Sequence, residues 1–205
     1  MAWTAVDDFN SYSDGDLNTL NGGTGWNGAW SGSSNFDVQG STVYEGSKAV
    51  TNTVSSNISR SLTTPVSGDG NVMYIAMRKT TNNDGGMRLL LDSAGDRRVS
   101  ISFNSGGNIL GEATTITSYS ANTWYVLRIT LNTDANTYTV ATSTGAYGSA
   151  STFSADSSAI AMTGASGGDI ATVIFDVDVG GDAFYDYISG TSPFGESSQN
   201  ANWYM

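Results

Sequence analysis

Aspartates at alternating positions form the clearest candidate for a metal-binding site in this sequence. Asp176 and Asp178 are two residues apart, so in an extended strand they share a face, and Asp182 follows after Gly180 and Gly181. Calcium in proteins takes roughly six to eight oxygen ligands, many of them from carboxylates and backbone carbonyls. The pattern predicts a calcium site, and a solvated strand face followed by an Asp/Gly turn is the alternative explanation.

Two tryptophans among glycines form a second candidate site, in this case for a sugar. Trp26 and Trp30 lie within the glycine-rich segment 21–31. Aromatic faces bind the apolar faces of sugar rings, and glycines let a ligand approach the backbone. The alternative is that both rings fill the interior, because tryptophan is mostly buried on average. The polar loops at residues 82–86 and 104–108 are further candidates for hydrogen bonds to sugars.

The chain lacks the residues that much of enzyme chemistry requires. None of its 205 residues is histidine or cysteine. Ser-His-Asp and Cys-His nucleophile systems, His/Cys metal sites and disulfides are therefore excluded. We expect a protein without enzymatic activity and with no cofactor other than the calcium considered above.

The charge balance restricts the partners. Eight basic and 19 acidic residues give a net charge of −11, which opposes binding to phosphate backbones and anionic membranes. We therefore expect neither nucleic acid nor a membrane as a partner. The N-terminal residues lack the basic and apolar regions of a secretory signal peptide. Two routes to the outside remain, a signal removed before position 1 or release within a virus particle.

Alternation of apolar and polar residues predicts several short strands between turns rich in Gly, Asn and Asp. The expected strands cover residues 72–77, 87–92, 98–104, 124–131, 137–141, 170–179 and 183–188. The strand at 72–77 is apolar on both faces, which indicates a covered central strand. We expect the strands at 87–92 and 98–104 to be its neighbours. Strands of this length and spacing favour a two-sheet sandwich.

The chain length fits one all-β domain followed by a short tail. We place the domain at residues 1–190 and the tail at residues 191–205, because Pro193 follows a polar turn. Large aromatic side chains would stabilise nothing in an unstructured tail. We therefore predict that Trp203 and Tyr204 dock against this domain or a neighbour.

Several segments together resemble the concanavalin A-like (laminin G-like) lectin/glucanase superfamily. They are Asp8-Phe9, residues 21–31, residues 124–129, which resemble the mid-domain strand, and residues 174–180, which resemble the closing strand. The resemblance implies an all-β fold, a two-sheet antiparallel jelly-roll sandwich. It also implies that the closing strand pairs back near the N-terminus. Asp8 would then lie near the aspartates at 176–182 and complete the calcium shell.

The same superfamily includes lectins, glycan-hydrolysing enzymes, adhesion modules and domains of phage and bacterial surface proteins, so the fold alone does not assign a function. Its hydrolase branch carries a Glu-x-Asp-x-x-Glu strand, which is absent here. Glycoside hydrolysis needs two carboxylates across one bond, and no pair of acids stands out in the sequence. This absence supports the expectation of a non-enzymatic protein.

We therefore expect a structural or adhesion protein at a virion surface, such as a bacteriophage capsid decoration or fibre-head domain. Its partners would be other virion proteins, further copies of itself, or a cell-surface glycan. The alternative is a carbohydrate-binding module of a secreted bacterial protein, with or without a dependence on calcium. A polysaccharide-degrading enzyme is the third interpretation.

Overall fold

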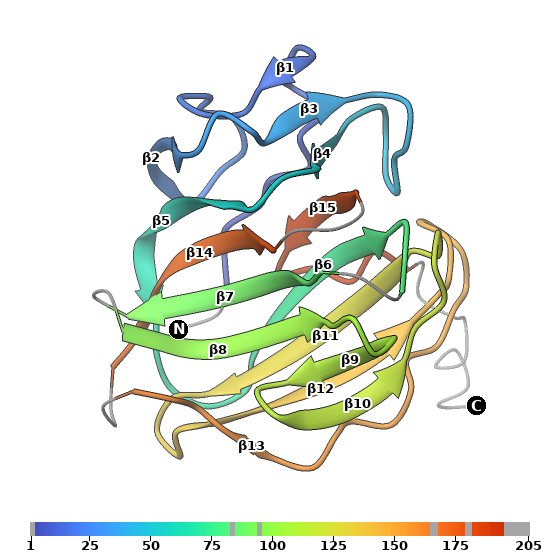
Figure 1. The fold of residues 1–205 in the computed structure, drawn as a ribbon. Helices are drawn as coiled ribbons and strands as arrows, with labels where there is room; N and C mark the ends of the chain where they lie inside the picture. The colour runs from blue at the N-terminus through green and yellow to red at the C-terminus, as the bar shows by residue number, and fades with distance from the viewer. Residues whose placement is uncertain (1–2, 83–84, 94–95, 165–167, 179–181, 195–205) are drawn as a thin grey trace, which may run out of the picture.

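The computed structural model describes residues 3–82, 85–93, 96–164, 168–178 and 182–194, which form a β-sandwich (Figure 1). Within these ranges, no helix is present that could span a membrane. The strands are β1 (Gly15–Asp16), β2 (Trp26–Gly32), β3 (Asp37–Gln39), β4 (Ala49–Asn52), β5 (Ser56–Val66), β6 (Asn71–Lys79), β7 (Met87–Ser93), β8 (Asp96–Phe103), β9 (Asn108–Gly111), β10 (Thr114–Ser118), β11 (Tyr125–Asn132), β12 (Thr137–Ser143), β13 (Ile160–Ala161), β14 (Ile170–Val177) and β15 (Ala183–Ser189).

The strands form two sheets that pack face to face. The eight-stranded sheet has the order β1-β3-β4-β15-β6-β11-β12-β13, and the seven-stranded sheet has the order β10-β9-β8-β7-β14-β5-β2. Neighbouring strands pair antiparallel throughout both sheets. The predicted all-β, two-sheet antiparallel sandwich is thereby confirmed.

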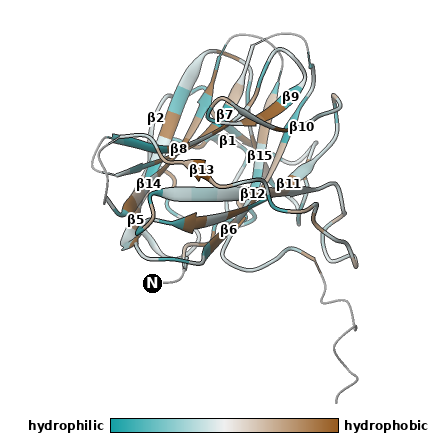
Figure 2. Ribbon diagram, turned by 90° about the horizontal axis from the view of Figure 1, so that it is seen from below, coloured by the Kyte–Doolittle hydropathy of each residue, from teal (hydrophilic) through white to brown (hydrophobic). Residues whose placement is uncertain are grey.

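The core lies between the sheets because apolar side chains recur at every second position of the strands. Hydrophilic and hydrophobic residues alternate along many of these strands (Figure 2). Across the interface, the rings of Phe175 in β14 and Tyr185 in β15 stack with centroids 4.1 Å apart and planes 8° apart. The Tyr185 hydroxyl lies within hydrogen-bond distance of the backbone oxygens of Arg88, at 3.0 Å, and Asp176, at 3.1 Å. This side chain therefore joins the two sheets by packing and by hydrogen bonds.

The strands predicted from alternation are present, although β14 ends at Val177 and residue 179 of the predicted strand 170–179 lies outside the described residues. The expected neighbours of residues 72–77 are wrong. These residues belong to β6, which lies between β15 and β11. β7 and β8 pair with each other in the opposite sheet. The connection from β6 to β7 crosses between sheets instead of closing a hairpin. Turn-forming residues predict that the chain reverses its direction, but they do not specify with which strand the next strand pairs.

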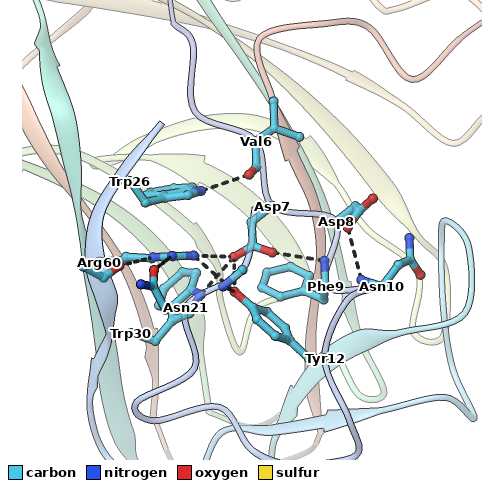
Figure 3. Close-up of polar contacts among 12 residues, drawn as sticks. Val6, Asp7, Asp8, Phe9, Asn10, Tyr12, Asn21, Trp26, Trp30 and Arg60 are labelled. Carbon is cyan, nitrogen blue, oxygen red and sulfur yellow. Dashed lines mark hydrogen bonds and ion pairs between the residues drawn. The ribbon is translucent and has the colours of Figure 1, made fainter. Parts of the chain in front are cut away.

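The N-terminal segment is held inside the sandwich by a buried polar cluster (Figure 3). Asp7 accepts hydrogen bonds from Arg60 Nη1 at 2.7 Å, Tyr12 Oη at 2.9 Å and Trp30 Nε1 at 3.1 Å. Asn21 accepts from Arg60 Nη2 at 2.6 Å. Burial raises the pKa of Asp7, and these donors oppose that shift. The cluster therefore satisfies charges that would otherwise be costly inside the protein.

The glycine-rich segment before β2 is needed for the N-terminal segment to approach closely. Gly23 has a φ of 69°, and a Cβ there would lie 2.2 Å from the backbone oxygen of Val6. Gly25 has a φ of 79°, and a Cβ there would lie 2.7 Å from the Cα of Ala5. These glycines thus serve backbone packing.

Candidate functional site

A hollow lined by aromatic and hydroxyl side chains lies on the loops beside the outer face of the eight-stranded sheet. We call it the aromatic pocket; its volume is about 320 Å³. Its lining comprises Val43, Tyr44, Thr123, Trp124, Thr144, Gly145 and Ala146. The residues come from the loop before β4, the turn before β11 and the loop after β12. Three separate connections therefore meet at this point.

Two rings give this pocket its apolar surface. Tyr44 and Trp124 are both half-buried, and their ring centroids are 5.8 Å apart. Trp124 also meets Phe184 of β15 edge-to-face at 6.3 Å, and the guanidinium of Arg78 lies over Phe184. The Tyr44 hydroxyl donates to the backbone oxygen of Gly145 at 3.0 Å. The rings are thus fixed by contacts on several sides.

The loop that carries Tyr44 is fastened to the sheet by one buried carboxyl. Asp186 of β15 is fully buried, and its Oδ2 accepts from the backbone nitrogens of Tyr44 at 2.9 Å and Glu45 at 3.0 Å. Its Oδ1 accepts from the backbone nitrogen of Tyr187 at 2.7 Å. Burial raises the pKa of Asp186 to about 8. This carboxyl therefore positions one wall of the aromatic pocket without being exposed to a ligand.

A second hollow of about 280 Å³ lies at the seven-stranded sheet. We call it the polar pocket; its lining comprises Gly85, Gly86, Arg88, Ser102, Asn104, Ser105 and Asp178. The Arg88 guanidinium donates to Asp176 Oδ2 at 2.8 Å and to Asp178 Oδ1 at 2.9 Å. The pocket thus presents amide, hydroxyl and charged groups.

The four aspartates predicted to bind calcium lie in three places. Asp176 and Asp178 share Arg88, as described above. Asp182 exchanges hydrogen bonds with Thr80. Asp8 accepts a hydrogen bond from the backbone nitrogen of Asn10. The neighbouring Asp7 pairs with Ile188 of β15 and not with β14. Among the described residues, no group of three or more metal-ligating side chains is found.

Calcium is expected to leave the thermal stability unchanged. The carboxylates of Asp176 and Asp178 already pair with the Arg88 guanidinium, and a bound metal would have to displace it. Melting curves in millimolar calcium and in chelator should therefore have the same midpoint. A higher midpoint in calcium would show that the predicted site forms after all.

The two tryptophans predicted as a sugar platform have different environments. Trp30 is only 1% exposed and packs on Phe175 with centroids 4.9 Å apart, so its face is unavailable to a ligand. Trp26 is half-buried, donates from Nε1 to the Val6 backbone oxygen and lies under the guanidinium of Arg60. For Trp30 the platform hypothesis is wrong, and both rings serve the N-terminal packing.

The remaining predicted contact residues, Trp203 and Tyr204, lie outside the described residues. Within the predicted tail, Phe194 packs against Phe153 at 5.1 Å, and Pro193 accepts a hydrogen bond from the backbone nitrogen of Gly148. The first residues of the tail therefore pack on the domain. The boundary at residue 190 stays a prediction.

Sequence reasoning missed Tyr44, Trp124 and Asp186 as site residues. Trp124 had a usable signal: residues 125, 127, 129 and 131 point inward, so position 124 points outward together with Val126 and Arg128. A tryptophan on the outer face of a strand is a candidate binding residue. No comparable local signal marks Tyr44 or Asp186, which meet across 142 positions of the chain.

Comparison with known proteins identifies the fold. The chain is similar to a sialidase, with a TM-score of 0.54 and 11% identity over 76% of this chain and 17% of that one. It is also similar to a GH131 β-glucanase catalytic domain from Podospora anserina, with a TM-score of 0.50 and 10% identity over 77% of this chain and 79% of that one. No protein-family model and no curated protein matches. The predicted concanavalin A-like jelly roll is confirmed as a fold, and a fold by itself does not assign a function.

Proposed function

We propose that this protein is a non-enzymatic glycan-binding module that uses the aromatic pocket. The observation that carries the proposal is the Tyr44–Trp124 pair, with Thr123 and Thr144 beside it in a pocket of about 320 Å³. Ring faces contact the CH groups of a sugar, while hydroxyls and backbone groups hydrogen-bond to its OH groups.

Binding is favoured over hydrolysis by the positions of the nearest acids. Among the described lining residues of the aromatic pocket, none carries a carboxyl. Asp186 is fully buried with both oxygens engaged by backbone nitrogens. Glu45 accepts from Asn10 Nδ2 at 2.5 Å, and burial raises its pKa. Two carboxylates exposed on either side of one glycosidic bond, which hydrolysis requires, are therefore not provided here.

Two substitutions should weaken binding by different routes. Trp124→Ala removes the main ring face, and Ala146→Phe fills the pocket from an exposed loop position. In a glycan array followed by calorimetry, each variant should bind at least about tenfold more weakly than the original protein. Ala150→Phe is the matched control, because Ala150 is also exposed but does not line the pocket.

Using two different pocket variants distinguishes a loss of binding from a loss of folding. Ala146→Phe removes no packed side chain, so its circular dichroism spectrum and melting midpoint should match those of Ala150→Phe. Unchanged affinity in both pocket variants would overturn the proposal. Release of shortened products from any bound glycan would overturn its non-enzymatic part.

We further propose that this module acts at a virion surface, where it associates with other virion proteins or with further copies of itself. The support is the acidic composition, which keeps the exterior soluble and opposes nucleic acid binding. A carbohydrate-binding module of a secreted bacterial protein is the competing setting. Co-purification with phage particles supports the first, whereas an attached catalytic domain encoded in the same gene supports the second.

A further inference from the structure

A second apolar cluster lies on the outer face of the eight-stranded sheet, separate from the core between the sheets. Ile75 and Met77 of β6 point into the core, so Ala76 between them points to the opposite face. We call the group around it the outer cluster; its buried members are Ala76, Val126, Tyr187 and Phe194, and the half-buried rings packed on it are Tyr44, Tyr74, Trp124 and Phe153. Both rings of the aromatic pocket therefore belong to a larger aromatic group on one side of the molecule.

Tyr147 extends this aromatic group beyond the aromatic pocket. Its ring meets the ring of Tyr44 edge-on, with centroids 6.2 Å apart, and the ring of Tyr187 with centroids 5.3 Å apart. Trp124 contacts the same Tyr44 ring at 5.8 Å. Trp124 and Tyr147 are therefore both neighbours of one ring, and both lie against the outer cluster.

The Tyr147 side chain is open to solvent. It is 45% exposed, and among the described residues only Val54, at 44%, is another large hydrophobic side chain with such exposure. Its neighbour in the chain, Ala146, lines the aromatic pocket. Single exposed apolar residues are common, but this ring continues the apolar surface of a pocket, and contiguous surfaces of this kind mark binding sites.

The loop that carries Tyr147 is held on both sides of this residue. Before it, the backbone oxygen of Gly145 accepts a hydrogen bond from the Tyr44 hydroxyl at 3.0 Å. After it, the backbone nitrogen of Gly148 donates to the backbone oxygen of Pro193 at 2.8 Å. A ligand that contacts the Tyr147 ring would therefore lose little affinity to ordering of this loop.

The backbone of β15 is distorted where it supports Tyr147. Tyr185 and Ile188 both belong to the core, although strict alternation would place residues three apart on opposite faces. The register between β15 and β6 shifts within this stretch, and Tyr187 has a φ of 51°, which is rare for a residue other than glycine. This bulge turns the Tyr187 ring outward, against Tyr147. Backbone strain of this kind is concentrated at functional sites.

Acidic side chains near Tyr147 restrict the charge of a ligand. Partial burial raises the pKa of the Tyr147 hydroxyl, and the charges of Glu45 and Asp8 raise this pKa further. The chain as a whole carries a net charge of −11. Sulfated or carboxylated sugars would therefore be repelled beside this ring.

We propose that the binding surface continues from the aromatic pocket to Tyr147, so that one uncharged oligosaccharide places one sugar ring against Trp124 and a later ring against Tyr147. This inference rests on the proposed glycan-binding function and adds the charge class and the extent of the ligand. Affinity should rise with chain length, because Tyr147 contributes only when the ligand is long enough to reach it.

Calorimetry with neutral linear gluco-, manno- and galacto-oligosaccharides, from monosaccharide to hexasaccharide, tests the arrangement. Tyr147→Ala removes the exposed ring. Val54→Ala is the matched control, because Val54 is exposed to nearly the same degree but lies in the connection from β4 to β5 and does not line the pocket. We expect the longest bound oligosaccharide to bind about tenfold more weakly to Tyr147→Ala than to Val54→Ala. The shortest bound one should bind equally to both, and Tyr147→Phe, which keeps the ring, should bind like the original protein.

The outcomes separate this inference from the proposed function. A loss that is confined to the longer ligands and is absent in Tyr147→Phe supports the inference. An equal loss for the shortest and the longest ligand would show that Tyr147 only positions Tyr44, and this result overturns the inference. Binding that depends on Trp124 but is the same in Tyr147→Ala and Val54→Ala also overturns it and leaves the proposed function standing.

Two further results bear on the class of ligand. Carboxylated oligosaccharides of the same length should bind more weakly than the neutral ones, and equal or tighter binding overturns the assignment of an uncharged ligand. If the original protein binds none of the neutral oligosaccharides, the inference is overturned. If it also binds nothing on the glycan array, the proposed function is removed with it.

Discussion

Arg60→Met is expected to lower the free energy of unfolding by about 3–5 kcal/mol, because it leaves the Asp7 carboxylate buried without its partner. The side chains of Arg60 and Asp7 are each 1% exposed, and Nη1 lies 2.7 Å from Oδ2. Methionine keeps most of the arginine's volume, so the loss measures charge and hydrogen bonding more than packing. Urea unfolding at neutral pH provides the measurement.

Three comparisons make this result specific. The loss should shrink at lower pH, because a protonated Asp7 carries no charge to be compensated. The double variant Arg60→Met/Asp7→Asn should be more stable at neutral pH than Arg60→Met alone. Lys48→Met, which removes the exposed ion pair with Asp14, should cost less than about 1 kcal/mol. If Arg60→Met costs no more than Lys48→Met, the buried cluster is not what holds the N-terminal segment.

The strands were predictable because their patterns are local. Val99, Ile101 and Phe103 alternate with polar residues, and all three are fully buried in β8. Strand partners were not predictable in the same way. β6 pairs with β15, which follows it by more than 100 positions in the chain. β7 pairs with the equally late strand β14. Such pairings depend on which apolar faces meet in the complete sandwich, and a turn sequence does not encode them.

The candidate site was predictable only where side-chain direction follows from strand alternation. Asp176 and Asp178 were correctly placed on one face, but Arg88 from β7 occupies that face with them. The glycines around Trp30 also fit the pattern of a ligand platform. Trp30 is nevertheless buried, because these glycines allow the N-terminal backbone to approach closely. The aromatic pocket combines three loops distant in sequence, so no local pattern contains it.

Stability is expected to fall as the pH rises from about 4 to 8, with Asp186 as the main cause. Its pKa is about 8 in the folded protein, against about 3.9 in an unfolded chain. Between these values the folded protein holds a proton that the unfolded chain has released, so the unfolding free energy decreases as pH increases. The contribution is complete below about pH 4 and is lost by about pH 8. Within this window the slope from one such group is about 1.4 kcal/mol per pH unit.

Asp186→Asn tests the origin of this slope. Asparagine keeps the shape but cannot titrate, and its amide leaves at least one of the three backbone donors unpaired, at a cost of about 1–3 kcal/mol. The variant should therefore be less stable than the original protein near pH 5, and the difference should shrink toward pH 8. Burial also raises the pKa values of Asp7, Glu45, Asp92 and Glu112, so a shallower slope of the same sign should remain. Parallel stability curves for the two proteins would show that Asp186 does not titrate in this range.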